Sequence, residues 1–403
     1  MTAVDKYNIN LLGDEEQRRR LNPVREMMRE AGIGQAIIRN NANIYYLTGR
    51  TFRGFVYINT GLDSPRYFIR QPNHLTEPDK ALYRHIHKPE QIPALLEEER
   101  IDTSSPVALE LDLISCSEAT RLAACFGQTP DKNISGILRR ARSVKTAAEL
   151  AAIRASGIRQ TLVYERIPHL YKRGMTDIEF QIEIERALRL EGCLGIFRVC
   201  GPDMEIFMGN VLTGANGDTP SPYDFAMGGE GMDPSLPVGA NGTLIAENAP
   251  VMVDMNGNFN GYMTDMTRMY VSGEASAKAK TANQLSVDIC DALAAMMKPG
   301  AKACDLYNKA LKMAEDAGMA DCFMGHRFHA GFVGHGIGIE VNELPVLAPR
   351  SKDILCAGNV IAVEPKFVIP GLGAVGIENT YAVRESGAPE LLTTARTEIM
   401  QLD

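Results

Sequence analysis

The chain has 403 residues, which is long enough to suggest two domains. Of these residues, 45% are hydrophobic and 23% are charged, which is the composition of a globular protein. Its net charge of −8 argues against a nucleic-acid partner. No run approaches the roughly 18 apolar residues of a membrane span, and no basic segment followed by an apolar one marks a signal peptide. The eight cysteines are scattered without a Cys-x-x-Cys pair, which fits reduced thiols and a cytoplasmic protein.

The N-terminal part mixes helical and β-type segments. A charged helix is expected over 15–31, with Pro23 indicating a late start or a kink and Gly32 ending it. Strands are predicted at 35–39, 55–58, 66–70 and 107–111. This mixture predicts a small α/β domain, and we place the domain boundary so that residues 1–140 and 141–403 fold separately.

Two capping boxes, Thr146 with Glu149 and Thr176 with Glu179, predict helix starts in the second domain. Apolar stripes on these helices are expected at Leu150, Ile153 and Ile158 and at Ile178, Ile182, Ala187 and Leu188. Further helices are expected at about 276–297 and 303–317, each followed by Gly or Pro-Gly. Strands are predicted at 250–255, 265–272, 359–367 and 375–383.

Four acidic residues and one histidine of the second domain point to a metal site. They are Asp254, Asp265, His335, Glu364 and Glu378. Each carboxylate lies in or beside an apolar β-rich stretch, where burying an unpaired ionised acid is costly. Four such acids together need cations, or some of them must stay protonated.

Each of these residues has a simpler interpretation when it is taken alone. His335 would then be a hydrogen-bonded core histidine, Asp265 would pair with Arg268, and Glu364 would be a solvent-exposed acid at a strand end. Taken together and in this order, the five residues favour a metal site. The glycines around His335 would let the backbone turn sharply and bring the imidazole in.

The five residues resemble the ligand set of the pita-bread-fold metallopeptidases: methionine aminopeptidase, prolidase (Xaa-Pro dipeptidase), aminopeptidase P and the metal-free relative creatinase. The second Asp follows the first by eleven residues and precedes Thr-Arg, the His lies in Gly-His-Gly-Ile-Gly, and Glu364 precedes Pro365. The segments 43–49 and 143–150 resemble the family's N-terminal half. The resemblance implies an α+β chain: a C-terminal pita-bread domain with a curved antiparallel sheet and outer helices, after a smaller creatinase-type α/β domain.

The resemblance also implies two divalent metal ions. Asp265 and Glu378 would bridge both ions, Asp254 would complete the shell of the first, and His335 and Glu364 that of the second. The oxygen-rich donor set favours manganese, with cobalt, iron and zinc as alternatives. Two ions about 3.5–4 Å apart would share one water, lower its pKa and polarise a carbonyl, with Glu364 as general base.

The substrate side departs from the family pattern. Active peptidases have a histidine where this chain has Asn342, and a second, upstream histidine cannot be present because none lies between His169 and His326. Gly376 stands where aminopeptidase P-like members have arginine. Asn342 can donate a hydrogen bond to an oxyanion but cannot exchange protons at neutral pH. Histidines that would compensate are His326, His329, or His74, His85 and His87 of a second copy.

Three functions therefore stay open. The first is a dinuclear metal hydrolase that resembles Xaa-Pro dipeptidase and aminopeptidase and cleaves the bond before proline, with Glu364 and Asn342 as catalytic residues. The second uses the same metals on a non-peptide substrate, as a C–N hydrolase or a lyase. The third is a non-catalytic binding protein, which would not need all five ligands. We expect a small peptide or other small molecule as substrate, neither membrane nor nucleic acid as partner, and, by resemblance, a homodimer.

Overall fold

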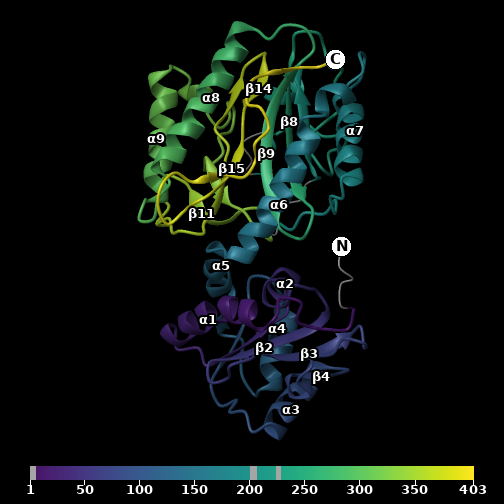
Figure 1. Cartoon of the computed structure of the whole chain (residues 1–403), viewed down its shortest axis with the longest axis vertical. Helices are drawn as coiled ribbons and strands as arrows, with labels where there is room; N and C mark the ends of the chain where they lie inside the picture. Colours follow the sequence, from purple (N-terminus) through teal and green to yellow (C-terminus); the bar gives the residue numbers. More distant parts are fainter. Residues whose placement is uncertain (1–5, 200–206, 224–227) are drawn as a thin grey trace. The chain divides into compact units, whose positions relative to one another are not determined.

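The computed structural model describes residues 6–199, 207–223 and 228–403. The chain divides into two compact units, Met1–Arg142 and Ser143–Asp403 (Figure 1). Within the described ranges, no helix combines the length and the apolar character that a membrane crossing requires.

The first unit is built on one mixed sheet of six strands in the order β4-β3-β2-β1-β5-β6. Its strands are β1 (Gln35–Ile38), β2 (Arg53–Asn59), β3 (Arg66–Gln71), β4 (Tyr83–His85), β5 (Val107–Leu109) and β6 (Lys132–Asn133). Its helices are α1 (Asp14–Glu30), α2 (Asn41–Thr48), α3 (Ile92–Glu98), α4 (Cys116–Cys125) and α5 (Ser135–Ser143). Strands β1, β2 and β3 pair antiparallel, whereas β5 joins β1 in parallel. Ile37, Tyr57 and Phe68 are among the core side chains of this sheet.

Helix α1 begins before Pro23 and runs through it, so the predicted late start is wrong. An internal proline costs a helix about 3 kcal/mol, because it removes one backbone hydrogen bond and crowds the preceding turn. Leu21, Val24 and Met28 are fully buried on the inner face of α1. At roughly 1.5–3 kcal/mol for each buried side chain, their burial outweighs the proline.

The described residues of the second unit form three sheets, with strand orders β11-β10-β12-β15-β16, β13-β14 and β17-β9-β8-β7. The strands are β7 (Gly209–Thr213), β8 (Pro250–Asn258), β9 (Met263–Val271), β10 (Gly334–Gly336), β11 (Glu343–Leu347), β12 (Val360–Val363), β13 (Lys366–Ile369), β14 (Gly373–Gly376), β15 (Asn379–Ala382), β16 (Glu390–Leu391) and β17 (Met400–Gln401). The helices are α6 (Ala147–Tyr164), α7 (Asp177–Leu190), α8 (Ala277–Met296) and α9 (Ala303–Asp316).

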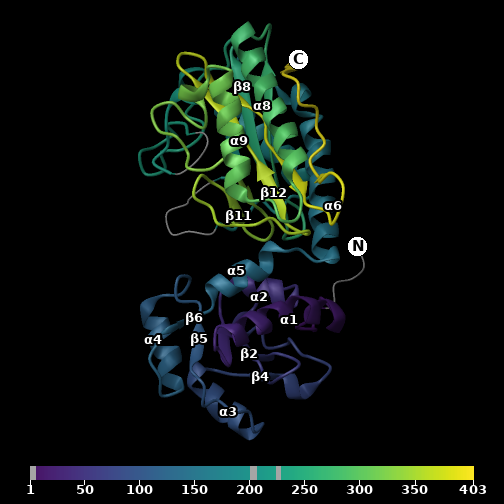
Figure 2. The same ribbon diagram turned by 90° about the vertical axis from the view of Figure 1, so that its left-hand side faces the viewer.

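Helices cover the strands of the second unit on two sides (Figures 1 and 2). In Figure 1, α8 and α9 lie on one side and α6 and α7 on the other. Two apolar cores match these layers. One joins α8 and α9 to residues such as Ile361 and Phe367, and the other joins α6 and α7 to residues such as Val251 and Met266. The strands between the two helix pairs are therefore shielded from water on both faces.

Both predicted capping boxes are confirmed, with the hydroxyls of Thr146 and Thr176 each accepting a backbone hydrogen bond at the third helical residue. The predicted apolar stripes are wrong in part. Ile158 and Ile182 are 57% and 55% exposed. Ile182 lies two residues after the buried Phe180, which is about 200° around the helix. The buried face of α7 consists instead of Phe180, Ile184 and Leu188.

The two predicted strands 359–367 and 375–383 are each broken in the middle. Pro365 separates β12 from β13, because a residue without an N–H cannot continue a ladder. Gly376 ends β14, and β15 begins at Asn379. Glu364 and Glu378 each lie in one of these breaks, so both carboxylates emerge where the chain passes from one sheet to another.

Glu77 of the first unit makes the stability of the protein depend on pH. The residue is 9% exposed, and its Oε2 is buried and has no hydrogen-bond partner among the described residues. Burial, together with the charge of Asp14, raises the pKa of Glu77 to about 7. The folded state then holds this proton more tightly than the unfolded chain, whose glutamates titrate near about 4.3. The Glu77 contribution to stability is present below that pH and is lost as the pH rises through about 7.

We therefore expect Glu77→Gln to become more stable relative to the wild type as the pH rises from about 4.5 to about 8, a range that spans the pKa of Glu77 in the unfolded and in the folded protein. Urea midpoints measured at several pH values for both proteins check this. The exposed Glu26→Gln is the control and should show no such trend. A difference between Glu77→Gln and wild type that does not change with pH would contradict the assignment.

Candidate metal centre

The register of the β8–β9 hairpin places Asp254 and Asp265 on one face. Asp254 pairs with Thr267, and Asn256 pairs with Asp265. Because alternate residues of a strand share a face, the two aspartates are diagonal neighbours across the hairpin. The spacing of eleven residues is therefore what this hairpin needs to bring two carboxylates together. Asn256 Nδ2 donates a hydrogen bond of 3.1 Å to Asp265 Oδ2 and fixes its orientation.

His335 lies on β10, between β11 and β12, and is 4% exposed. Its Nδ1 lies 3.0 Å from the carbonyl oxygen of Gly336. Because a carbonyl only accepts, Nδ1 carries the proton, and in the neutral ring Nε2 is left as a lone-pair donor. Nε2 lies 3.5 Å from Glu364 Oε1 and 4.0 Å from Glu378 Oε1.

The glycines flanking His335 serve close packing and not the sharp turn expected from the sequence. Neither Gly334 nor Gly336 has a positive φ. A Cβ at Gly334 would lie 2.5 Å from the carbonyl oxygen of Ala362, and one at Gly336 would lie 2.1 Å from that of Leu344. Since β10 is enclosed by a neighbour on each side, side chains at these positions would force the strands apart and shift the imidazole.

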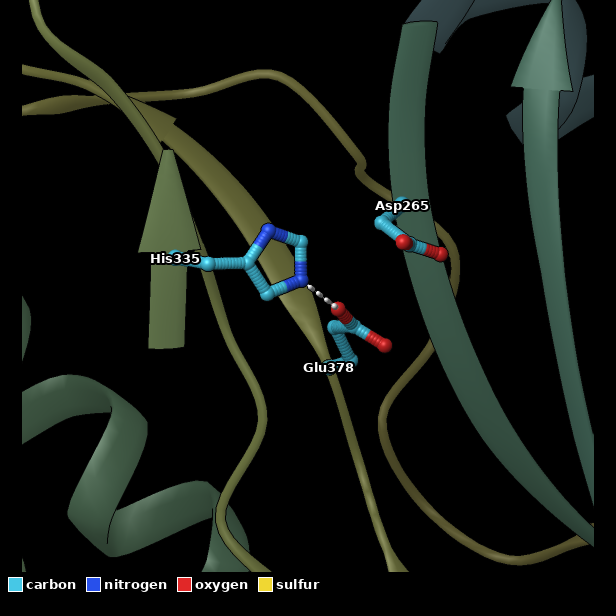
Figure 3. Close-up of side chains that lie close together, drawn as sticks. All are labelled: Asp265, His335 and Glu378. Atoms are coloured by element: carbon cyan, nitrogen blue, oxygen red, sulfur yellow. Dashed lines mark ion pairs between the residues drawn. The ribbon is translucent and has the colours of Figure 1, made fainter. Parts of the chain in front are cut away.

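The five predicted residues come together in the interior of the second unit. They form two overlapping groups, Asp265 with His335 and Glu378, and Asp254 with Glu364 and Glu378. Within each group the candidate ligand atoms lie within 4.8 Å of one another. Figure 3 shows that Asp265, His335 and Glu378 point toward one another from three different segments. Glu378 belongs to both groups, as expected of a bridging carboxylate.

Lys366, which the sequence analysis did not single out, lies in the second of these groups. Its side chain is 1% exposed, and its Nζ donates to Asp254 Oδ2 at 2.6 Å and to Glu364 Oε2 at 2.7 Å. A longer contact of 3.4 Å reaches Glu378 Oε2. Glu364 and Lys366 are two residues apart beside a strand, a spacing that directs side chains to the same face. This two-residue spacing, within the largely apolar residues 360–369, is the feature of the sequence from which the position of Lys366 beside Glu364 could have been inferred.

The electrostatics of the cluster are dominated by burial and by mutual repulsion of the acids. Burial raises the pKa of Asp254 to about 6, opposed by the Lys366 ammonium. Burial and the neighbouring carboxylates raise the pKa of Asp265 well above its usual range. Burial lowers the pKa of His335, so that the neutral ring is favoured. Burial would also lower the pKa of Lys366, but the surrounding carboxylates outweigh it and raise that pKa.

The group formed by Asp265, His335 and Glu378 fits a divalent cation. Among the described residues, Glu378 Oε1 is fully buried and accepts no hydrogen bond. It faces His335 Nε2, which is also without a proton to donate, so two electron-pair donors meet with no positive charge between them. Carboxylate and imidazole donors of this kind suit manganese, iron, cobalt or zinc. A bound cation would satisfy both atoms at once.

Arg268 does not pair with Asp265, which was the simpler interpretation of that aspartate. The guanidinium is completely buried and donates to the carbonyl oxygens of Thr267, Glu378 and Ala395 at 2.7–3.1 Å. It therefore ties β9 to the segment that carries Glu378. Thr267 Oγ1 adds a hydrogen bond of 2.9 Å to Glu378 Oε2 and holds that carboxylate from the other side.

Asn342 follows His335 in a tight loop and is half-buried. Its φ of 64° lies in the left-handed region, where asparagine and histidine are tolerated better than most residues. The next residue, Glu343, anchors the loop by accepting backbone hydrogen bonds from Ile339 and Glu340 at 3.1 Å. The Lys145 ammonium donates to the same carboxylate at 3.0 Å, in a pair that is almost fully buried.

The described residues supply no second histidine to the two ligand groups. His329 Nδ1 bonds to the carbonyl oxygen of Phe323 at 2.8 Å. His326 lines a pocket that also includes Asp218, Ser221 and Val368, the last of which belongs to the strand that Lys366 begins. The lining of this pocket includes none of the five candidate ligands, so a substitute histidine stays a prediction.

Comparison with known proteins gives a consistent assignment. Metallopeptidase family M24 matches residues 151–385, more than half of the chain, and the creatinase/prolidase N-terminal domain matches residues 20–144. An Xaa-Pro dipeptidase of Pyrococcus furiosus is 24% identical over 381 residues, which cover 94% of this chain and 98% of the relative. An Xaa-Pro dipeptidase of Lactobacillus delbrueckii subsp. lactis is 26% identical over 277 residues, covering 68% and 67%.

Solved structures show the same fold. An Xaa-Pro dipeptidase from Bacillus anthracis superposes with a TM-score of 0.78 at 21% identity, covering 96% of this chain and all of its own. An X-Pro aminopeptidase from Thermotoga maritima gives a TM-score of 0.75 at 21% identity, covering 94% and 99%. The predicted fold class, a pita-bread domain preceded by a creatinase-type domain, is confirmed.

Replacing Arg268 by methionine should destabilise the second unit while keeping most of the side-chain volume. The carbonyls of Glu378 and Ala395 would lose a buried donor, at roughly 1–3 kcal/mol for each acceptor left unsatisfied. We expect the free energy of unfolding in chelator to fall by several kcal/mol in a urea titration. Arg173→Met is the control, because Arg173 is 84% exposed and its ion pair should contribute little. A loss no larger than that of the control would contradict the role given to Arg268.

Proposed function

Because the chain belongs to metallopeptidase family M24, we propose that it is a metal-dependent hydrolase of small peptides, with dipeptides of the Xaa-Pro type as its substrates. The observation that carries this proposal is the buried group of Asp265, His335 and Glu378, in which Glu378 Oε1 has no hydrogen-bond partner among the described residues and lies 4.0 Å from His335 Nε2. The similarity to Xaa-Pro dipeptidases supports this substrate class, since the match covers 98% of the length of one of them.

A divalent ion in this group supplies Lewis-acid polarisation of a carbonyl and a nucleophile from water at neutral pH. We propose Asp265, His335 and Glu378 as the ligands of this ion and manganese as the first ion to test; Asp254 and Glu364 are the further ligands predicted for a second ion. A second ion, a homodimer and a cytoplasmic location remain predictions from the sequence.

Glu364 is the proposed general base. Lys366 holds its Oε2, and its Oε1 lies 3.5 Å from His335 Nε2, so one oxygen is fixed and the other faces the ligand group. A carboxylate in this position can take a proton from the attacking water. Asn342 is the proposed hydrogen-bond donor to the developing oxyanion, since its side-chain amide has donors that a carboxylate lacks.

A second candidate is hydrolysis of a C–N bond in a small molecule other than a peptide. Gly376 favours it, because a Cβ there would lie 2.7 Å from the carbonyl oxygen of Pro365. The backbone therefore excludes the arginine that aminopeptidase P-like members have at this position. Asn342 stands where active peptidases of the family have a histidine, so a proton-exchanging group is missing there as well.

The proposed activity is tested with a panel of Xaa-Pro dipeptides and matched dipeptides without proline, in the presence of manganese. We expect cleavage before proline that is lost on chelation and restored by the metal. Glu364→Gln keeps an oxygen ligand without the base and should lower the rate by about 10²–10⁴-fold. If a Glu364→Gln protein retains its metal and cleaves within about threefold of the wild-type rate, far less than the loss expected on removing a general base, then Glu364 is not the general base. No cleavage of any dipeptide, with hydrolysis of a non-peptide amide, would favour the second candidate.

Asn342→Ala should slow dipeptide cleavage without changing metal content. Loss of one oxyanion donor costs about 2.7–4 kcal/mol, or two to three orders of magnitude in rate, in a well-studied protease. Asn342→His should preserve or raise the rate, because histidine tolerates the same left-handed backbone and also donates. The readouts are kcat for the dipeptide and metal content by mass spectrometry. Undiminished cleavage by Asn342→Ala would leave oxyanion stabilisation to the metal site.

A further inference from the structure

We infer that the ammonium of Lys366 takes the place of the second metal ion, so that the protein holds a single divalent ion between Asp265, His335 and Glu378. This inference rests on the proposed function for the remaining ion. The two ligand groups are not equivalent in the structure. One contains a buried carboxylate oxygen without a hydrogen-bond donor, and the other contains a buried cation.

The contacts of Lys366 leave no room for an ion in the second group. Its Nζ lies at hydrogen-bonding distance from Asp254 Oδ2 and Glu364 Oε2, at 2.6 and 2.7 Å, and 3.4 Å from Glu378 Oε2. An ammonium has three donor hydrogens and no lone pair, so it matches three carboxylates and cannot itself ligate a metal. A metal ion bound by the same three residues would meet a like charge at the centre of the group, in an interior that screens charges poorly.

The backbone around Lys366 is adapted to this arrangement. Lys366 pairs with Gly376 in the two-stranded sheet β13–β14. A Cβ at Gly376 would lie 3.0 Å from the Cα of Lys366 and 2.7 Å from the carbonyl oxygen of Pro365. The absence of a side chain at 376 therefore lets the two strands approach and holds the start of β13 against the cluster. The α8 residue Ser286 fixes the same place through its hydroxyl, which contacts Pro365 and accepts from the Ile377 N–H.

The single-ion centre changes what the acids can do. Glu364 is held by an ammonium and not by a second metal, so its Oε2 is committed to a hydrogen bond while its Oε1 stays directed toward His335. Asp254 is likewise neutralised by a proton-bearing group. The lysine thus acts as a positioning residue for both carboxylates, and the divalent ion alone supplies Lewis acidity.

The test is the number of manganese ions per chain. Wild type, Lys366→Ala and Lys145→Ala are stripped with chelator, reloaded with manganese, freed of excess ion and measured by mass spectrometry of metal content. We expect about one ion in the wild type and about two in Lys366→Ala, since the shortened side chain opens the Asp254–Glu364–Glu378 group as a second site. Electron paramagnetic resonance should show an isolated ion in the wild type and a coupled pair in the variant. Lys145→Ala removes an equally buried lysine from another pair and should keep the wild-type number.

Each result decides between the alternatives. Two coupled ions in the wild type, or a single ion in both wild type and Lys366→Ala, would overturn the inference and leave the proposed hydrolase intact. If Lys366→Ala does not fold, His335→Ala replaces it: loss of the only ion supports the assignment, and retention of one ion contradicts it. No ion in the wild type would instead defeat the proposed metal hydrolase. In that case, the inference that Lys366 replaces a metal ion would stand if the Lys366→Ala variant bound a manganese ion, and would fall if it bound none.

Discussion

Four carboxylates buried within one small volume are the constraint on which the second unit depends. Ionised acids in an apolar interior repel each other and lose hydration, and only cations or protons offset that cost. The fold meets part of it with Lys366, whose ammonium contacts three of the acids. Glu378 Oε1 remains without a hydrogen-bond partner among the described residues and lies 4.0 Å from His335 Nε2. A cation bound there would offset the cost of burial that remains.

The surrounding framework holds the acids in position through hydrogen bonds to the backbone. Arg268 joins Thr267 to the backbone of Glu378, and Thr267 also bonds the Glu378 carboxylate directly. Thr380 exchanges hydrogen bonds with the backbone of Asp265 across the adjoining strands. These bonds run between different sheets, so the hairpin β8–β9 and the strand β15 form one frame. The ligand geometry is set by backbone-directed contacts, which a change in charge at the centre leaves in place.

Much of this could be predicted from the sequence, for identifiable reasons. The eleven-residue spacing of Asp254 and Asp265 reflects a hairpin register, and a register is a local property. The capping boxes are local as well, and both were correct. Ile158 and Ile182 were misplaced because an apolar side chain does not reveal which face of a helix meets the sheet. Lys366 was missed because a lone lysine in an apolar strand gains its meaning only from the acids that distant segments bring to it.

One departure from the family pattern, Gly376, is connected with the buried lysine of the cluster. Gly376 and Lys366 face each other across β13–β14, and the missing side chain of the first makes room for the close approach of the second. Asn342 stands at the far end of the loop that starts at His335, anchored by the buried Lys145–Glu343 pair. The inferred single-ion centre would polarise a substrate less than a two-ion centre, and the amide of Asn342, proposed as the oxyanion donor, would not exchange protons at neutral pH.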